Sequence, residues 1–191
     1  MLVAHLVPGY FITIQSKSRW QPNWTVRQCA LLRLAALGST IAPDLDVVYN
    51  VIFHDFFNHS TLWTHSLFPY ISILFIWWIL RQSRRWPYLQ MLAWLIALGG
   101  ISHLLLDVVA HGTPLLYPLL VTMVGVPPQR VVEGGVWAYL TDPIFLFEPF
   151  LLTLAAIHWL LHNAHDQRVR IIGLIILIAG LSIFTTSFLL L

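Results

Sequence analysis

Charged residues are scarce in this chain, and their scarcity separates a membrane protein from a soluble one. Lys, Arg, Asp and Glu make up 9% of the 191 residues, whereas hydrophobic residues make up 58%. A typical soluble domain carries about 25% charged residues. The composition therefore excludes an ordinary soluble domain and predicts an integral membrane protein. The net charge of +2 is too small to indicate a nucleic acid partner, and none is expected.

Cysteine is almost absent as well. Cys29 is the single cysteine, so an internal disulfide and a metal site built on several thiolates are both excluded. The first residues contain no basic segment and no clear cleavage site, so we expect no removable signal peptide.

Long apolar runs dominate what remains. Four of them, at about 66–80, 88–110, 143–163 and 171–191, approach the ~20 residues that cross a bilayer as a helix. Two weaker runs, at about 2–15 and 28–43, could be short tilted, re-entrant or interfacial helices. The runs predict an all-α fold, a polytopic membrane helix bundle of about four to six transmembrane or re-entrant helices.

The basic residues alternate with these runs along the chain. Nine of the ten lie near the turn after the first, third or fifth run: Lys17, Arg19, Arg27, Arg33, Arg81, Arg84, Arg85, Arg168 and Arg170. The positive-inside rule then predicts six crossings with both termini outside the cytoplasm. Most acidic residues and six of the nine histidines fall at the opposite, extracytoplasmic ends of the runs.

The most informative motif is His103-Leu-Leu-Leu-Asp107-Val-Val-Ala-His111. Residues four apart lie on one face of a helix, so the motif stacks two imidazoles and a carboxylate. Ionisable groups in an apolar helix are costly unless a partner satisfies them. A metal site is the favoured interpretation. The alternatives are a buried polar ladder that packs helices together and a helix end that emerges into water.

Three further segments carry similar groups. In Ala42-Pro43-Asp44-Leu45-Asp46, a proline turn can bring both carboxylates to one centre, or they can be solvated acids at a helix end. In the segment 59–66, His59 and His65 are candidate ligands, and Thr64 or Ser66 could cap the following run. His5 is a weaker candidate, because a lone histidine near a helix start is often incidental.

Two groups near the fifth run complete the candidates. Asp142-Pro143 suits a helix start, and Glu148 could be a ligand, a general base or a partner of a ligating histidine. We predict Glu148 and Asp142 as catalytic residues. A weak second cluster lies at the inner end of this run and is more simply explained as a solvated helix end: His158, His162, His165 and Asp166.

The predicted metal ligands offer only oxygen and nitrogen donors: His5, Asp44, Asp46, His59, His65, His103, Asp107 and His111. Imidazole and carboxylate suit zinc most, with manganese or iron as alternatives. This number of ligands exceeds what one tetrahedral ion needs. We expect two or three clustered ions, an arrangement that suits phosphoester hydrolysis.

These motifs resemble the YdjM-like family of membrane-bound metal-dependent hydrolases. The resemblance covers about residues 1–145 and is carried by Ala4-His5, Gly38-Ser-Thr-Ile-Ala-Pro-Asp-Leu-Asp46, Thr64-His65-Ser66, and Ser102-His103-Leu-Leu-Leu-Asp107 followed by Gly112-Thr-Pro. That family is in turn distantly similar to the zinc phospholipase C and single-strand nuclease superfamily, whose ligands occur in a similar chain order. One departure stands out: Ser60-Thr61 replace an Arg-Gly pair of the family, and the segment from His59 to His65 is one residue longer.

The resemblance implies a membrane-embedded, metal-dependent hydrolase in the inner or plasma membrane. We expect it to cleave a phosphoester of a membrane lipid or lipid-linked phosphate, such as a polyprenyl phosphate, at the extracytoplasmic face. We expect a single membrane domain over 1–191, with the metal-site region in 1–145 and C-terminal transmembrane helices in 146–191. The alternative is a non-enzymatic membrane protein, either a metal or proton transporter or a scaffold with a structural metal site.

Overall fold

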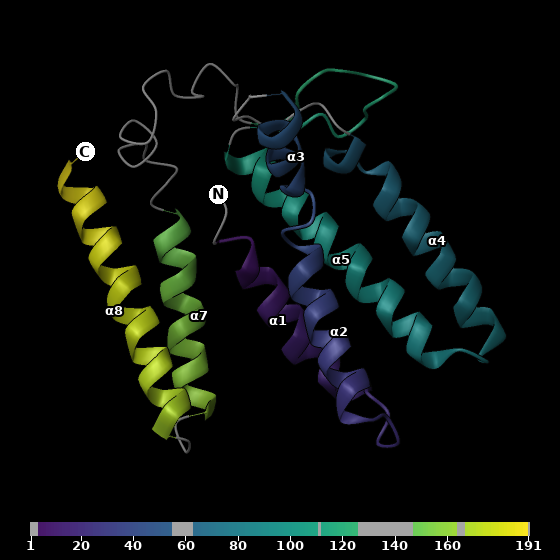
Figure 1. Ribbon diagram of the computed structural model, residues 1–191, viewed down its shortest axis with the longest axis horizontal. Coiled ribbons are helices and arrows are strands. Elements are labelled where there is room, and N and C mark those ends of the chain that lie inside the picture. The colour runs from purple at the N-terminus through teal and green to yellow at the C-terminus, as the bar shows by residue number, and fades with distance from the viewer. Residues whose placement is uncertain (1–3, 55–62, 111, 126–146, 164–166, 191) are drawn as a thin grey trace. The chain divides into compact units, whose positions relative to one another are not determined.

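All regular secondary structure is helical in the part that the computed structural model describes, which comprises residues 4–54, 63–110, 112–125, 147–163 and 167–190. The α-helices are α1 (Leu6–Ser16), α2 (Val26–Ser39), α3 (Leu45–His54), α4 (Phe68–Ser83), α5 (Pro87–Ala110), α7 (Phe147–Asn163) and α8 (Gln167–Leu190). Two single-turn 3-10 helices, η1 (Lys17–Arg19) and η2 (Trp63–His65), join them, and no β-strand occurs in these residues. The predicted all-α class is therefore correct (Figure 1).

The chain divides into two compact units, Ala4–Pro128 and Gln129–Leu191. In the larger unit, α5 packs against α1, α2 and α4, and in the smaller unit α7 pairs with α8. Every predicted apolar run corresponds to a helix, whereas α3 is a short helix that the run analysis did not predict. The expectation of one membrane domain over 1–191 stays a prediction.

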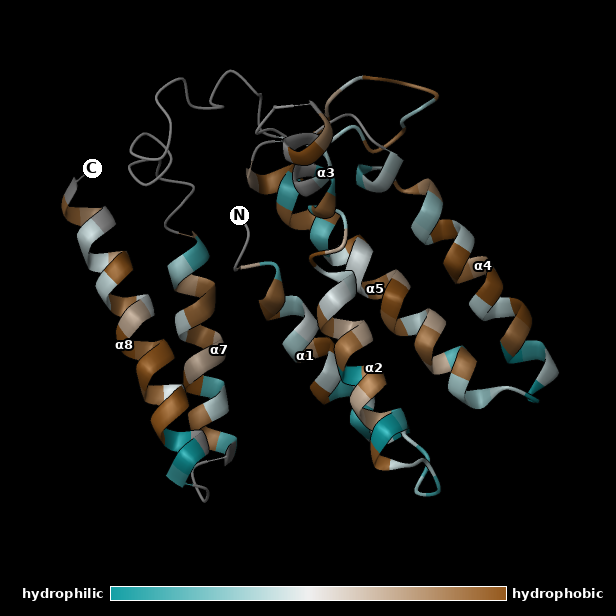
Figure 2. Ribbon diagram, in the orientation of Figure 1, coloured by the Kyte–Doolittle hydropathy of each residue, from teal (hydrophilic) through white to brown (hydrophobic). Residues whose placement is uncertain are grey.

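Only α5, within the described residues, is both long and apolar enough to cross a bilayer. The apolar parts of α7 and α8, Phe147–His162 and Arg170–Thr186, are shorter. Figure 2 shows hydrophobic residues, in brown, along the helices of both units. The number of crossings and the orientation of the termini remain predictions.

Local sequence signals explain where the helices begin. Thr25 and Gln28 form a capping box at the start of α2: the Gln28 amide donates to the Thr25 hydroxyl at 3.2 Å, and the Thr25 amide donates to Gln28 Oε1 at 2.8 Å. Pro87 opens α5, where its missing N–H costs no helical hydrogen bond. The predicted cap of α4 is wrong, because Leu67 occupies the N-cap position and the Ser66 hydroxyl donates back to the Trp63 carbonyl at 2.7 Å.

The core of the larger unit lies where α2 crosses α5. Leu32, Ala36 and Leu95 are fully buried there. Towards the other end of α5, two glycines allow neighbours to approach closely. A Cβ at Gly99 would overlap Ser39 of α2, and a Cβ at Gly100 would overlap the ring of Tyr70 of α4. Small residues at these two positions therefore bring three helices together just before His103 on α5.

Candidate metal centre

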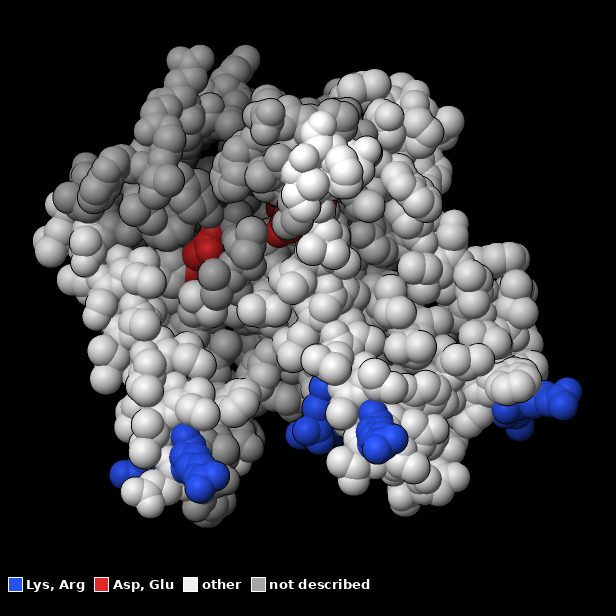
Figure 3. Space-filling view, viewed as in Figure 1, with Lys and Arg blue, Asp and Glu red and all other residues white. Residues whose placement is uncertain are grey.

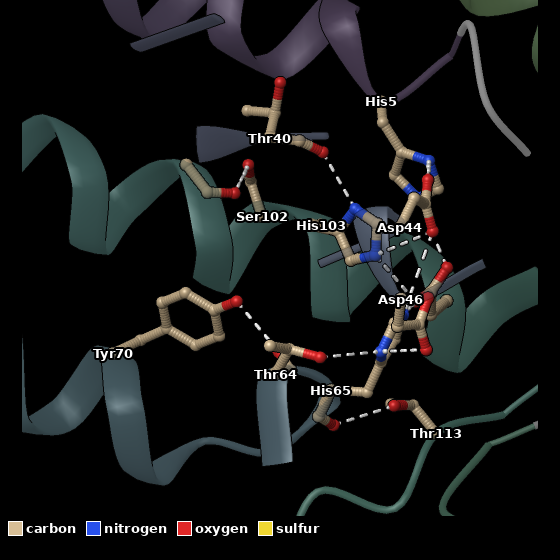
Figure 4. A network of polar contacts seen from close by, with 12 residues as sticks. His5, Thr40, Asp44, Asp46, Thr64, His65, Tyr70, Ser102, His103 and Thr113 are labelled. Carbon is tan, nitrogen blue, oxygen red and sulfur yellow. Dashed lines mark hydrogen bonds and ion pairs between the residues drawn. The ribbon is translucent and has the colours of Figure 1, made fainter. Parts of the chain in front are cut away.

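Six ionisable side chains from four segments meet at one end of the larger unit. His5 precedes α1, Asp44 and Asp46 flank the start of α3, His65 ends η2, and His103 and Asp107 lie one turn apart on α5. Each of the six is at most 6% exposed. Figure 4 shows the cluster, with His103 between His5 and His65.

The ring nitrogens of the three histidines face carboxylate oxygens at short distances. His103 Nε2 lies 3.0 Å from Asp107 Oδ2 and 3.5 Å from Asp44 Oδ1. His5 lies between the same two acids, with Nδ1 3.4 Å from Asp44 Oδ2 and Nε2 3.2 Å from Asp107 Oδ1. His65 Nδ1 lies 3.4 Å from Asp46 Oδ2, and its Nε2 lies 3.6 Å from Asp107 Oδ2.

The protonation of His103 follows from a backbone contact. Its Nδ1 lies 2.8 Å from the carbonyl oxygen of Thr40, in the turn after α2. A carbonyl can only accept a hydrogen bond, so Nδ1 carries the proton. A neutral His103 then directs the lone pair of Nε2 at the carboxylates, and this arrangement is repulsive unless a cation lies between them.

The same argument extends to all three histidines. All six of their ring nitrogens face oxygen atoms of Asp44, Asp46, Asp107 or Thr40. Three neutral imidazoles carry only three N–H groups. Added positive charge, as protons or as metal ions, would therefore stabilise the cluster.

Two triads of ligating atoms are close enough to hold an ion. One comprises His5, His103 and Asp107, and the other comprises Asp44, His65 and His103. Within each triad, the candidate atoms lie within 4.8 Å of one another. The buried imidazole and carboxylate groups thus fit a divalent metal ion, and their nitrogen and oxygen chemistry suits zinc, manganese or iron.

The carboxylates and imidazoles also shift each other's protonation. Burial alone would raise the pKa of Asp44, but hydrogen bonds from His5 and His65 outweigh it and hold that pKa well below its usual range. Burial alone would lower the pKa of His5, but hydrogen bonds to Asp107 and Asp44 offset this and raise it. A metal ion would have to displace the proton that these acids hold on His5.

A family model for the YdjM inner membrane protein matches residues 1–189. The chain belongs to the YdjM family. The match extends beyond the 1–145 region covered by the motifs and includes both helices of the smaller unit. Because the YdjM family is described as an inner membrane protein and α5 is a candidate span, the predicted membrane location is correct. No curated protein and no solved structure matches the chain significantly.

For this YdjM-family chain, the structure brings together six of the eight predicted ligands: His5, Asp44, Asp46, His65, His103 and Asp107. His59 and His111 lie outside the described residues, as does the predicted catalytic Asp142. Glu148 is buried in the first turn of α7, in the smaller unit. Its predicted catalytic role stays a prediction.

The second predicted cluster, at the inner end of the fifth run, is not arranged as a metal site in the residues that the structure describes. His158 and His162 stack along α7 with ring centroids 4.1 Å apart, and His162 Nδ1 contacts the His158 carbonyl oxygen at 2.9 Å. His162 is exposed. Neither histidine belongs to a candidate metal triad among the described residues, and His165 and Asp166 lie outside them.

Three residues that support the cluster were not predicted. The Thr40 carbonyl orients His103, the Tyr70 hydroxyl donates to the Thr64 carbonyl at 2.8 Å, and the Thr113 hydroxyl donates to the His65 carbonyl at 2.9 Å. The last two bonds fix the η2 turn that presents His65 (Figure 4). Thr40 and Thr113 lie within the family motifs, but their bonds require contacts that sequence spacing does not show.

Proposed function

We propose that this protein is a membrane-embedded, metal-dependent hydrolase that cleaves a phosphoester at the extracytoplasmic face. The observation that carries the proposal is the geometry of His103 in the buried cluster. That ring donates from Nδ1 to Thr40 and faces Asp107 with Nε2. A divalent ion between Nε2 and the carboxylate would be bound by both groups.

The residues that would hold the ions are His5, Asp44, Asp46, His65, His103 and Asp107. We propose zinc as the metal. The two triads share His103, whose Nε2 can ligate only one ion, so one ion would bind His103 and a second would need its ligands from the remaining residues. Bound divalent ions lower the pKa of water and neutralise the oxygens of a phosphoester. The chain's own contribution is to orient the ligands, through Thr40 for His103 and through Tyr70 and Thr113 for His65.

The reaction class rests on the resemblance to the zinc phospholipase C and single-strand nuclease superfamily. The ligand order His5, Asp44, His65, His103 and Asp107 follows that superfamily's pattern. Asp142 and Glu148 are proposed to orient or deprotonate the attacking water. A lipid or lipid-linked phosphate is the proposed substrate, because the cluster belongs to a membrane protein.

The test is metal analysis of the purified full chain combined with hydrolysis of phospholipid and polyprenyl phosphate esters. We expect one to two equivalents of a divalent metal, together with phosphoester cleavage that chelation abolishes. Asp107→Asn keeps the side-chain shape but removes the charge, and should lose both metal and activity. Ser102→Ala is the matched control, because the Ser102 hydroxyl donates to the Gly99 carbonyl and not to the cluster.

The outcomes separate the proposal from its rival. Wild-type protein without metal would overturn the metal centre. Metal bound at stoichiometric level, with no cleavage of any phosphoester, would instead support a scaffold or transporter with a structural ion.

A further inference from the structure

The cluster of histidines and aspartates lies less than one membrane thickness from the basic residues at the other end of the helices. Lys17 and Arg19 follow α1, Arg81 lies in the last turn of α4, and Arg84 and Arg85 precede α5. Figure 3 shows these basic side chains gathered at one edge of the larger unit. If these residues lie at the cytoplasmic boundary of the membrane, the depth of the cluster in the bilayer can be measured from them.

The distance from the basic residues to the cluster follows from the lengths of α5 and α1. His103 is 16 positions after Pro87 on α5, about 24 Å at 1.5 Å per residue. His5 precedes α1, whose 11 residues span about 16 Å before Lys17. The hydrocarbon core of a bilayer is about 30 Å thick. The two estimates place the cluster between about the middle and the outer part of the hydrocarbon, below the extracytoplasmic headgroups.

The first surface beside the cluster is a face of α3. Leu45, Tyr49, Ile52 and Phe53 recur at helical spacing along this helix and are 48–66% exposed. Asp46 lies in the first turn of this helix, and its carboxylate contacts His65. An apolar stripe on a short helix is typical of a segment that lies in the membrane interface.

The second surface is the loop that follows α5. Residues 113–125 contain no charged side chain, and Leu119, Leu120 and Val121 are 52–74% exposed. Hydrogen bonds hold the start of the loop next to the cluster. Thr113 pairs with Val124, the Thr113 hydroxyl donates to the His65 carbonyl, and the Leu67 amide donates to the Leu115 carbonyl at 2.9 Å.

Figure 1 shows α3 and this loop at the same end of the larger unit, and Figure 2 shows the apolar colouring of both. We call their exposed side chains the apolar rim: Leu45, Tyr49, Ile52, Phe53, Leu119, Leu120 and Val121. A soluble surface would not carry such a rim beside a charged cluster.

We propose that the apolar rim is immersed in the acyl chains of the outer leaflet, so that a phospholipid reaches the metal cluster sideways from the bilayer. Its acyl chains would contact α3 and the loop, while its phosphate would lie at the cluster. The placement of the rim rests on geometry alone, whereas the fate of the phosphate rests on the proposed function.

Spin-label accessibility tests the placement. In a Cys29→Ser background, the full chain carries one nitroxide at position 53 or 119 and is reconstituted in phosphatidylethanolamine and phosphatidylglycerol vesicles. Position 76, exposed on α4, is the membrane reference, and position 83, at the basic end of α4, is the aqueous reference. Metal content is measured for every variant, so that a disrupted fold is recognised.

We expect labels at 53 and 119 to collide with oxygen more than with a water-soluble nickel chelate, as at 76 and opposite to 83. Preferential collision with nickel would overturn the proposal, because the rim would lie in water. Low collision with both reagents would also overturn it, because another protein surface would then cover the rim.

A second measurement links the rim to catalysis. Leu119→Asp should reduce cleavage of phospholipid in vesicles relative to a dispersed short-chain ester by roughly tenfold, since a carboxylate is costly in hydrocarbon. Leu119→Met should restore the wild-type ratio. An unchanged ratio in Leu119→Asp would overturn sideways entry. If wild-type protein cleaves neither substrate, the proposed function fails, but the spin-label result still decides where the rim lies.

Discussion

His103 contacts Asp107 one helical turn further along α5, with 3.0 Å between Nε2 and Oδ2, while its other ring nitrogen is committed to the Thr40 carbonyl. The two residues are thus oriented toward each other by a backbone carbonyl from the turn after α2. His103 and Asp107 are therefore a pair of potential metal ligands on an apolar helix, and the tautomer of His103 is defined.

Replacement of His103 should therefore remove metal. His103→Gln cannot provide an imidazole Nε2 at the same point, so we expect at least a tenfold loss of metal affinity, measured by competition with a chromophoric chelator. His158→Gln is the control, because His158 stacks on His162 in the smaller unit. Equal affinities in both variants would contradict the ligand role of His103.

Tyr70 should act as a positioning residue for His65. Tyr70→Phe removes the hydrogen bond to the Thr64 carbonyl but keeps the ring that packs on Gly100. We expect metal affinity to fall by about tenfold to a hundredfold with little change in melting temperature. Tyr88→Phe is the control, because the Tyr88 ring packs against Trp24 and not against the cluster. It should leave metal affinity unchanged. A loss of stability without a loss of affinity would indicate that Tyr70 serves packing alone.

The glycines of α5 should be sensitive to size. Gly100→Ala would drive a Cβ into the Tyr70 ring and should destabilise the protein by about 1–3 kcal/mol, measured by thermal unfolding in detergent. A Cβ at Gly38 meets no atom within 4 Å, so Gly38→Ala should be neutral or slightly stabilising. Similar melting temperatures for the two variants would show that α4 does not pack on Gly100 as described.

Metal removal should lower the melting temperature in a pH-dependent way. Ligands must lose protons to bind metal, and the acids around His5 raise its pKa, so metal affinity should increase as pH rises through neutrality. The drop in melting temperature on adding chelator should therefore be larger at pH 8 than at pH 6. A chelator effect that is absent at both pH values would argue that protons, and not metal, satisfy the cluster.

Much of the fold could be predicted from local patterns. Apolar runs of the right length predicted the main helices, because a helix satisfies its own backbone in an apolar environment. The spacing of His103 and Asp107 placed both on one face of α5. The helix α3 was missed because its apolar stripe is short and follows a turn, and the cap of α4 was wrong because Ser66 bonds to a nearer carbonyl.

The membrane class, the helical architecture and the candidate ligands could be predicted, since they depend on composition and on spacing within single segments. Local patterns could not show that His5, Asp44 and His65 surround the α5 pair, or that Thr40, Tyr70 and Thr113 orient them. These contacts join segments up to about a hundred residues apart, and they depend on the close helix approach that Gly99 and Gly100 permit.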